Sequence, residues 1–469
     1  MAFVNRTREL AFLEQHFASG RAEFLVVYGR RRVGKTELLR NFSASRPHLF
    51  FVASQTTPEH LLRELSSLLT ELPDSPLPAG TVLQDWPSAF RLFGRLGRDR
   101  RFVVVLDEFP YMLQADPAVA SQLQNLWDVE LRRTTLMLVL CGSHVSVMES
   151  DVLGQRSPLY GRRTGQWRLM PLSYRHAAQF SPGYSQEDQL TTYGILGGMP
   201  AYLEQFDPNK ALGINVVEQI LSRGTMLYEE VQFLVSTELR EAARYYAALA
   251  AMAAGATQHS EIARAVFGPG SRDSAKPYLN RLEALHMVER RVPATVRDPQ
   301  RTRAAIYRIA DPFARFWFRF AVPNHSALEQ GRAREVWQQR IKPFLPDYVG
   351  QVFEDCARAH TWVLAGAARL PFEPDAVGSW WDGREEVDVV AVRHATRDAY
   401  LAECSWSGGP LHPREIDELK RKAAHFQTAT GYTPRGLALY ARRQFSPRLV
   451  AVAKQEGVSL YTLADLYAD

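Results

Sequence analysis

Short apolar runs alternate with amphipathic segments through the first third of the chain. Three runs, at residues 24–27, 102–106 and 135–144, are rich in valine, leucine and phenylalanine and are followed by glycine or polar residues. Runs of this length and composition predict buried strands of a parallel sheet. After the first run, apolar residues recur at helical spacing at Leu38, Leu39 and Phe42, which predicts an amphipathic helix. The pattern therefore predicts an α/β fold.

A different pattern covers residues 240–310, where we expect three short helices and a hairpin. The segment 271–288 has one apolar stripe made by Tyr278, Leu279, Leu282 and Leu285. Its exposed positions are Arg272, Lys276, Asn280 and Arg281. Two strand-like runs follow, around a basic loop that extends from Arg290 to Arg303. This order predicts a winged helix, which can bind DNA through its third helix and wing or serve as an internal regulatory module. Both alternatives stay open.

The composition is that of a folded, water-exposed protein. Of the 469 residues, 46% are hydrophobic and 23% charged, and the net charge of +5 is compatible with nucleic acid without requiring it. The three cysteines are widely spaced, so neither a disulfide framework nor a metal cluster is indicated. No apolar run reaches the roughly 18 residues of a membrane span. We expect a cytoplasmic protein with no membrane partner.

The loop after the first predicted strand has the spacing of a phosphate-binding loop. Gly29 is followed after four residues by Gly34, Lys35 and Thr36, between a predicted strand and a predicted helix. Glycines let backbone N–H groups face phosphate oxygens, and the helix N-terminus favours an anion. Lys35 is expected to bind the β- and γ-phosphates and Thr36 to contact Mg²⁺. The intervening Arg30, Arg31 and Arg32 are interpreted as a solvated basic rim.

Acidic and polar residues follow the other two predicted strands. Asp107 and Glu108 come directly after the second run, and Ser143 ends the third. We expect Asp107 to hold Mg²⁺ and Glu108 to orient and deprotonate the attacking water. Ser143 is a candidate sensor of the γ-phosphate, with a strand-end turn as the alternative. Arg162 and Arg163 are candidates for an arginine that approaches the γ-phosphate, although an exposed surface position is the simpler interpretation.

Several of these segments together resemble the archaeal-type ATPases of the AAA+/STAND group, over nearly the full length of the chain. They are "FVNRTREL", "GRRRVGKT", "VVVLDEF", "LCGSH", "SPLYGRRTG", "YGILGGMPAYL" and "YRIADPFARFWFRF". The resemblance implies ATP as the nucleotide and a sheet in which the sensor strand lies between the two Walker strands. It also implies that Arg6 lies near the adenine and that Gly198, Met199 and Pro200 report the nucleotide state to the following helices. From the residues alone, this last element is only a turn.

The C-terminal segment resembles the domain that accompanies this family, which is itself similar to the PD-(D/E)xK nucleases. Asp388 is expected to end a turn into an apolar strand and Glu403 to lie on the next strand, with Glu354 on a helix as a third acid. Such acids can bind Mg²⁺ as a second metal site. However, Ser405 occupies the position of the expected lysine. Lys420 and Lys422 are interpreted as a solvated helix face, with replacement of that lysine as the alternative. Two structural acids in a binding domain remain the competing interpretation.

The predicted architecture is therefore α/β: a P-loop ATPase core at residues 1–172, a helical lid at 173–235, a winged helix at 236–322 and a nuclease-like α/β domain at 340–469. We expect an ATPase that uses ATP and Mg²⁺ as a conformational switch coupled to the later domains. A nucleotide-gated DNA-binding or scaffold protein with little turnover is one alternative. An ATP-regulated, metal-dependent DNA nuclease is another. DNA, a protein partner and a second copy of the chain stay open as partners.

Overall fold

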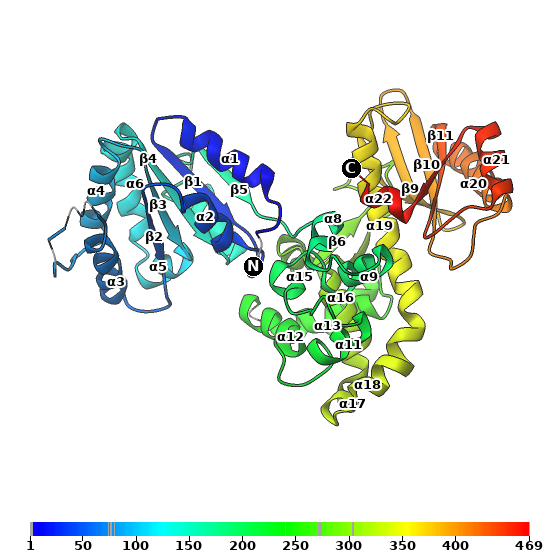
Figure 1. Cartoon of the computed structure of the whole chain (residues 1–469), viewed down its shortest axis with the longest axis horizontal. Coiled ribbons are helices and arrows are strands. Elements are labelled where there is room, and N and C mark those ends of the chain that lie inside the picture. Colours follow the sequence, from blue (N-terminus) through cyan, green and yellow to red (C-terminus); the bar gives the residue numbers. More distant parts are fainter. Residues whose placement is uncertain are drawn as a thin grey trace. The chain divides into compact units, whose positions relative to one another are not determined.

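The computed structural model describes residues 3–73, 75, 77–78, 80–239, 241–270, 274–302 and 304–468. Arg272 and Arg303, which the sequence places in the recognition helix and the wing, lie outside the described residues. The chain divides into two compact units (Figure 1). The N-terminal unit comprises Met1–Pro171 and Met199–Ala201, and the C-terminal unit comprises Leu172–Gly198 and Tyr202–Asp469.

A parallel five-stranded sheet forms the centre of the N-terminal unit. Its strands are β1 (Glu23–Tyr28), β2 (His48–Val52), β3 (Phe102–Asp107), β4 (Leu136–Gly142) and β5 (Gly165–Arg168), in the order β2-β3-β4-β1-β5. Every residue of β1, β3 and β4 is buried, which explains why these strands read as continuous apolar runs. The predicted position of the sensor strand is confirmed, because β4 lies between β1 and β3.

Helices flank this sheet and connect its parallel strands. They are α1 (Thr7–Ala18), α2 (Lys35–Ser43), α3 (Pro58–Thr70), α4 (Trp86–Leu96), α5 (Phe109–Ala115), α6 (Val119–Val129) and α7 (Val145–Val147). Helix α1 packs on α2, and α4 packs on α6. The helix predicted after the phosphate-binding loop is therefore present as α2.

The C-terminal unit begins with helices and a small hairpin. The helices are α8 (Tyr174–Ala177), α9 (Gln186–Leu196), α10 (Pro200–Leu203, whose first two residues belong to the N-terminal unit), α11 (Leu212–Gln219), α12 (Met226–Glu238), α13 (Ala242–Ala253), α14 (His259–Phe267) and α15 (Lys276–Ala284). The hairpin consists of β6 (Val288–Arg291) and β7 (Ile306–Ile309), which pair antiparallel. Helices α13, α14 and α15 and this hairpin follow the order expected of a winged helix.

A second five-stranded sheet lies toward the C-terminus. Its strands are β8 (Ala376–Trp381), β9 (Glu386–Arg393), β10 (Asp398–Ser405), β11 (Thr433–Ala441) and β12 (Val458–Thr462), in the order β12-β11-β10-β9-β8. Strands β10, β11 and β12 are parallel, whereas β9 is antiparallel to both of its neighbours. The accompanying helices are α20 (Arg414–Thr430), α21 (Pro447–Glu456) and α22 (Leu463–Tyr467). Asp388 lies inside β9 rather than at the end of a turn, because the strand already begins at Glu386.

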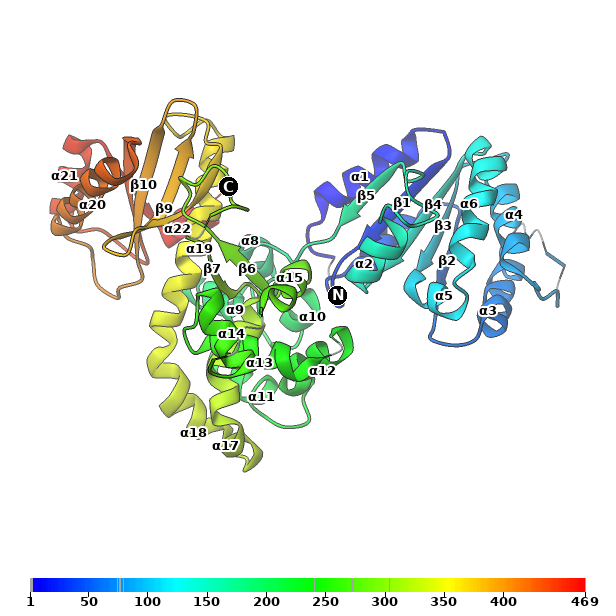
Figure 2. The same ribbon diagram turned by 180° about the vertical axis from the view of Figure 1, so that it is seen from behind.

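Helix α19 (Leu345–Gly366) joins the helical part of this unit to the sheet. It packs on α9 and on strands β8, β9 and β10, and Figure 2 shows it running between these elements. Helices α16 (Pro312–Phe316), α17 (His325–Glu329) and α18 (Ala333–Val336) precede it, connected by short 3-10 and π segments. The 22 residues of α19 therefore bring side chains from both regions into contact along one rigid element.

The loop of the β6–β7 hairpin is docked on the second sheet. Ala294 is part of the apolar core around Trp380, and its N–H donates to the carbonyl of Ser379 at 2.9 Å. Arg297 donates to the carbonyl of His394 at 2.9 Å. The predicted wing is thus in large part an intramolecular contact. Among the described residues, no helix combines the length and apolar character needed to cross a bilayer.

Candidate functional site

The loop between β1 and α2 requires both of its glycines. Gly29 and Gly34 have φ values of +154° and +95°, a region that favours residues without a side chain. A Cβ atom on Gly29 would lie 2.5 Å from the carbonyl oxygen of Leu169, so a larger residue has no room. Because α2 begins directly after Gly34, the unpaired N–H groups of its first turn are available to an anion.

Lys35 is fixed on the inner side of this loop. Its ammonium group donates to the carbonyl oxygens of Gly29 at 2.9 Å and Arg30 at 3.0 Å, and the residue is only 5% exposed. An ammonium group held by neutral carbonyls keeps its full charge. It is thus positioned to exchange these carbonyls for phosphate oxygens.

Thr36 and Asp107 meet across the carboxyl edge of the sheet. The Thr36 hydroxyl donates to Oδ2 of Asp107 at 2.7 Å, and Oδ1 of Asp107 accepts from the N–H of Glu108 at 2.9 Å. Asp107 is fully buried. A hydroxyl and a carboxylate are oxygen ligands of the kind that Mg²⁺ prefers. The pair therefore fits a magnesium ion, as the sequence predicts.

Glu108 lies beside Ser143 at the same edge. Oε2 of Glu108 accepts hydrogen bonds from the Ser143 hydroxyl at 2.8 Å and from its backbone N–H at 3.2 Å. Glu108 has a left-handed backbone, with φ +52°, which is costly for a residue other than glycine. This conformation directs its side chain from the end of β3 toward the end of β4. Ser143, predicted as a phosphate sensor, here contacts the predicted base.

Arg6 is buried against the backbone of the phosphate-binding loop. Its guanidinium donates to the carbonyl of Val33 at 2.8 Å and to that of Met170 at 2.8 Å, and forms an ion pair with Glu9 at 3.0 Å. Burial lowers the pKa of Arg6. The predicted contact with adenine is therefore accompanied by a structural role that the sequence did not indicate. Such carbonyl contacts leave no signal in a single sequence.

The predicted arginine and the predicted reporter element differ in their position. Arg162 forms a bidentate pair with Asp128, with Nη2 at 2.7 Å from Oδ2 and Nε at 3.1 Å from Oδ1. Pro200 approaches the loop, because its Cγ lies 3.8 Å from the place that a Cβ on Gly34 would occupy. Sequence reasoning missed Arg31, which donates to the Tyr111 hydroxyl rather than forming part of a solvated rim.

The acids predicted in the C-terminal domain lie around a lysine. The ammonium of Lys422 is 2.6 Å from Oε2 of Glu403, and its side chain is only 15% exposed. Asp388 accepts from the N–H of Cys404 at 2.8 Å. Burial, and then the nearby Asp388, raise the pKa of Glu354 to about 7 and that of Glu403 to about 8. The interpretation of Lys422 as solvated is therefore wrong.

The other lysine of this helix is more exposed: the Lys420 side chain is 47% exposed and pairs with Glu456 at 2.8 Å. Ser405 ends β10, two residues after Glu403. Within the described part of the chain, no group of three or more His, Cys, Asp or Glu side chains is arranged to hold a metal ion.

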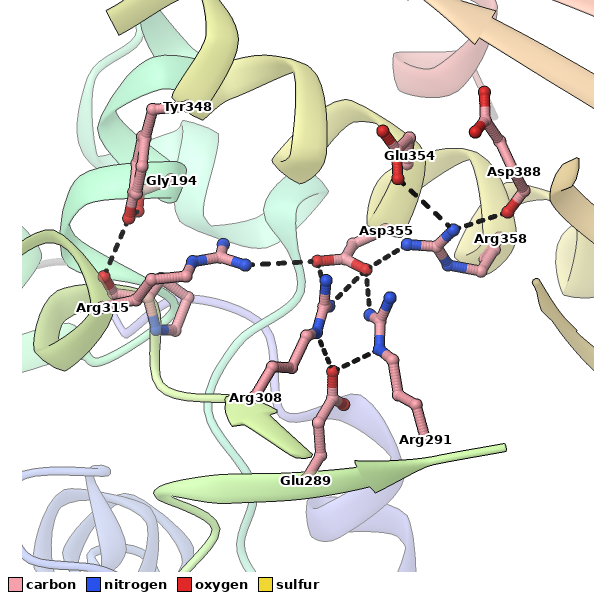
Figure 3. Close-up of polar contacts among 11 residues, drawn as sticks. Gly194, Glu289, Arg291, Arg308, Arg315, Tyr348, Glu354, Asp355, Arg358 and Asp388 are labelled. Atoms are coloured by element: carbon pink, nitrogen blue, oxygen red, sulfur yellow. Dashed lines mark hydrogen bonds and ion pairs between the residues drawn. The ribbon is translucent and has the colours of Figure 1, made fainter. Parts of the chain in front are cut away.

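An ion-pair cluster on α19 adjoins these acids (Figure 3). The carboxylate of Asp355 pairs with Arg291 and Arg308 of the hairpin and with Arg358 of its own helix. Arg315 of α16 lies 3.7 Å from the same carboxylate. Burial alone would raise the pKa of Asp355, but the surrounding guanidinium groups outweigh it and lower this pKa. One carboxylate thereby connects the hairpin, α16 and α19.

Two contacts extend the cluster in opposite directions (Figure 3). Arg358 donates to the carbonyl of Asp388 at 2.5 Å and lies 3.7 Å from Glu354, which links the cluster to the acids of the C-terminal domain. Tyr348, one end of α19, donates its hydroxyl to the carbonyl of Gly194 in α9 at 2.7 Å. Helix α19 thus contacts both α9 and the acidic residues.

Comparisons with known proteins agree with this geometry. A family model described as an ATPase domain predominantly from Archaea matches residues 3–206. An uncharacterised protein of Methanocaldococcus jannaschii is 31% identical over 423 residues, which cover 89% of this chain and 90% of that protein. The chain belongs to the archaeal-type ATPase family. In this archaeal-type ATPase, residues 317–422 match a second model, described as archaeal and bacterial proteins of unknown function.

Solved structures also match the archaeal-type ATPase described here. A Walker-type ATPase of Pyrococcus abyssi is 21% identical, with a TM-score of 0.49, and the match covers 68% of this chain and 96% of that one. The Aeropyrum pernix ORC2 protein, solved as ADPNP and ADP complexes, is 14% identical, with a TM-score of 0.41, and the match covers 70% of this chain and 96% of that one.

Proposed function

We propose that this archaeal-type ATPase hydrolyses ATP with Mg²⁺ and uses the cycle as a conformational switch for its C-terminal unit. The observation that carries the proposal is the convergence of Lys35, Thr36, Asp107 and Glu108 at one edge of the parallel sheet. A cation, a metal-binding pair and a carboxylate base are the groups that phosphoryl transfer to water requires.

Each residue has a defined task in this reaction. The N–H groups after Gly34 and the ammonium of Lys35 bind the β- and γ-phosphate oxygens. Thr36 and Asp107 would hold Mg²⁺, which neutralises charge on these oxygens. Glu108 orients a water and accepts its proton as the water oxygen bonds to the γ-phosphorus and the bond to the β-phosphate oxygen breaks. The products are ADP and phosphate. To act, Glu108 must exchange its contact with Ser143 for the water.

A continuous set of contacts supports the switch. Pro200 lies against Gly34 and follows α9 in the chain. Helix α9 binds Tyr348 of α19 through the carbonyl of Gly194, and α19 carries Asp355. A movement of the loop around Gly34 on nucleotide binding therefore has a route to the hairpin and to the second sheet. Contacts with two discrete arrangements are what such coupling needs.

We expect nucleotide to change amide hydrogen exchange in α19 and β9 of the wild-type protein, and Tyr348→Phe to reduce this change. The variant removes only the hydroxyl that binds the carbonyls of Gly194 and Pro312. Exchange is compared between ADP and a slowly hydrolysed ATP analogue, and calorimetry measures nucleotide binding separately. Lys35→Ala should abolish both binding and the change, because it removes the phosphate-binding cation.

A buried tyrosine of the second sheet, changed as Tyr400→Phe, is the matched control. Equal exchange in both nucleotide states, with nucleotide bound, would contradict the switch while leaving ATP binding intact. Tight retention of nucleotide without phosphate release would instead favour the scaffold with little turnover.

DNA is a further proposed partner, and the structure redirects where it would bind. Arg290 donates to the carbonyls of Pro299 and Thr302, and Arg297 to that of His394, so these wing residues are engaged within the protein. Lys276 and Asn280 of α15 are exposed. We propose that this helix, more than the wing, provides the contact with DNA.

Cleavage of DNA by the C-terminal domain is a second candidate function, favoured by Lys422. This lysine supplies the cation that Ser405 does not, and Asp388 and Glu403 are the carboxylates that would hold Mg²⁺ beside it. We expect cleavage with Mg²⁺ or Mn²⁺, reduced by about 10²-fold or more in Glu403→Gln and Lys422→Ala. The exposed Lys454→Ala is the control. DNA that stays intact with every metal would eliminate this function.

A further inference from the structure

Arg31 lies in the middle of the phosphate-binding loop and its side chain points away from solvent-exposed rim positions. One Nη2 atom donates to the Tyr111 hydroxyl at 2.9 Å and contacts Nε2 of His144 at 3.1 Å. Because a guanidinium only donates, Nε2 of His144 must be the acceptor and the imidazole is neutral. Both partners are therefore neutral groups. They set the direction of the guanidinium without cancelling its charge.

These two partners belong to the elements that carry the catalytic groups. Tyr111 is in α5, which begins directly after Glu108, and His144 follows Ser143, the residue that binds Glu108. The rings of Tyr111 and His144 pack edge-on, with centroids 5.5 Å apart, so the pair forms one rigid support. Arg31 and the proposed base thus contact consecutive residues at the end of β4.

The position of the γ-phosphate follows from the groups on either side of it. It must contact the ammonium of Lys35, which lies on the carbonyls of Gly29 and Arg30. It must also face the water held by Glu108. Arg31 is attached to the loop beside the first group and directed toward the second. A guanidinium in this place meets the equatorial oxygens on which negative charge accumulates in the transition state.

The other candidate arginine is committed elsewhere. Arg162 has three guanidinium contacts with the Asp128 carboxylate and also donates to the carbonyl of Pro158. Reaching a phosphate would require all of these bonds to break, whereas Arg31 needs only to exchange neutral partners. We propose that Arg31 is a catalytic residue that contacts the γ-phosphate from within the same chain and stabilises the transition state of ATP hydrolysis. The inference rests on the proposed ATPase function and adds a residue to it.

The test compares binding with turnover in Arg31→Ala, Arg31→Lys and wild type. We expect Arg31→Ala to lower kcat by about 10³-fold, the lower end of the effect of arginine fingers, with little change in KM. Binding of ADP with aluminium fluoride, a mimic of the transition state, should be lost, while binding of an ATP analogue persists. Arg31→Lys should restore part of the turnover, because it returns the charge without the planar fork.

The control is Arg132→Ala, an exposed arginine near the opposite end of β4. Thermal unfolding shows whether each variant is folded. Unchanged turnover in Arg31→Ala, with wild type active, would overturn the role and leave the ATPase function standing. Loss of ATP-analogue binding together with turnover in both Arg31 variants would also overturn it, because it would assign Arg31 to loop structure. A wild type that releases no phosphate would refute hydrolysis itself.

Discussion

Glu108→Gln is expected to lower ATP turnover by about 10³-fold, within the usual range for loss of a general base. Glutamine has the same shape and can keep the contacts with Ser143, so the site should remain assembled. It cannot accept a proton from the attacking water. ATP should therefore bind as in wild type and accumulate unhydrolysed, as measured by steady-state phosphate release and by the nucleotide extracted from the protein.

The comparison that makes this result specific is Glu71→Gln. Glu71 is an exposed acid that follows α3 in the same unit, and its loss should leave turnover unchanged. Turnover in Glu108→Gln equal to that of wild type would remove Glu108 from the mechanism. Loss of ATP binding would instead show that the carboxylate charge organises the site rather than the water.

Asp355→Ala is expected to destabilise the C-terminal unit by about 3 kcal/mol, the lower end of the range for breaking a buried ion pair. The Asp355 side chain is 25% exposed and faces Arg291, Arg308, Arg315 and Arg358. Removing it leaves several guanidinium groups close together without their shared carboxylate. Hydrogen exchange of amides in α19 and the β6–β7 hairpin in increasing urea measures the local loss.

A surface pair provides the control for Asp355. Asp398 binds Arg435, whose side chain is 57% exposed, and Asp398→Ala should cost less than about 1 kcal/mol. The pKa of Asp355 is lowered in the folded protein. Its stabilisation is therefore present above the unfolded pKa of about 4 and is lost as the pH falls through the folded value. A variant as stable as wild type at neutral pH would show that the cluster does not join these elements.

The nucleotide-site residues could be predicted because they are close in sequence to the elements that place them. Gly34, Lys35 and Thr36 occupy one turn between a strand and a helix, and Asp107 and Glu108 end an apolar strand. Parallel strands in one sheet end at one edge, so the loop and the acids had to meet there. The position of β4 between β1 and β3 came only from the family resemblance, because periodicity does not specify strand order.

The C-terminal site was less predictable for the same reason. Lys422 is 19 residues from Glu403 and on a helix, so its direction depends on how α20 packs on the sheet. A basic residue on an amphipathic helix reads as solvated until this packing is known. The docking of the wing through Ala294 is similar, since alanine has no signature of an interface.

The sequence by itself determined the α/β class, the phosphate-binding loop and the acids that face it, because these depend on local periodicity and on spacings of a few residues. Only the tertiary structure decided which arginine faces the nucleotide site, what Arg6 holds, and how Asp355 joins four arginines from three elements. A long cationic side chain can reach partners in many directions. The direction it takes is set by carboxylates and carbonyls that are distant in sequence and brought close only by folding.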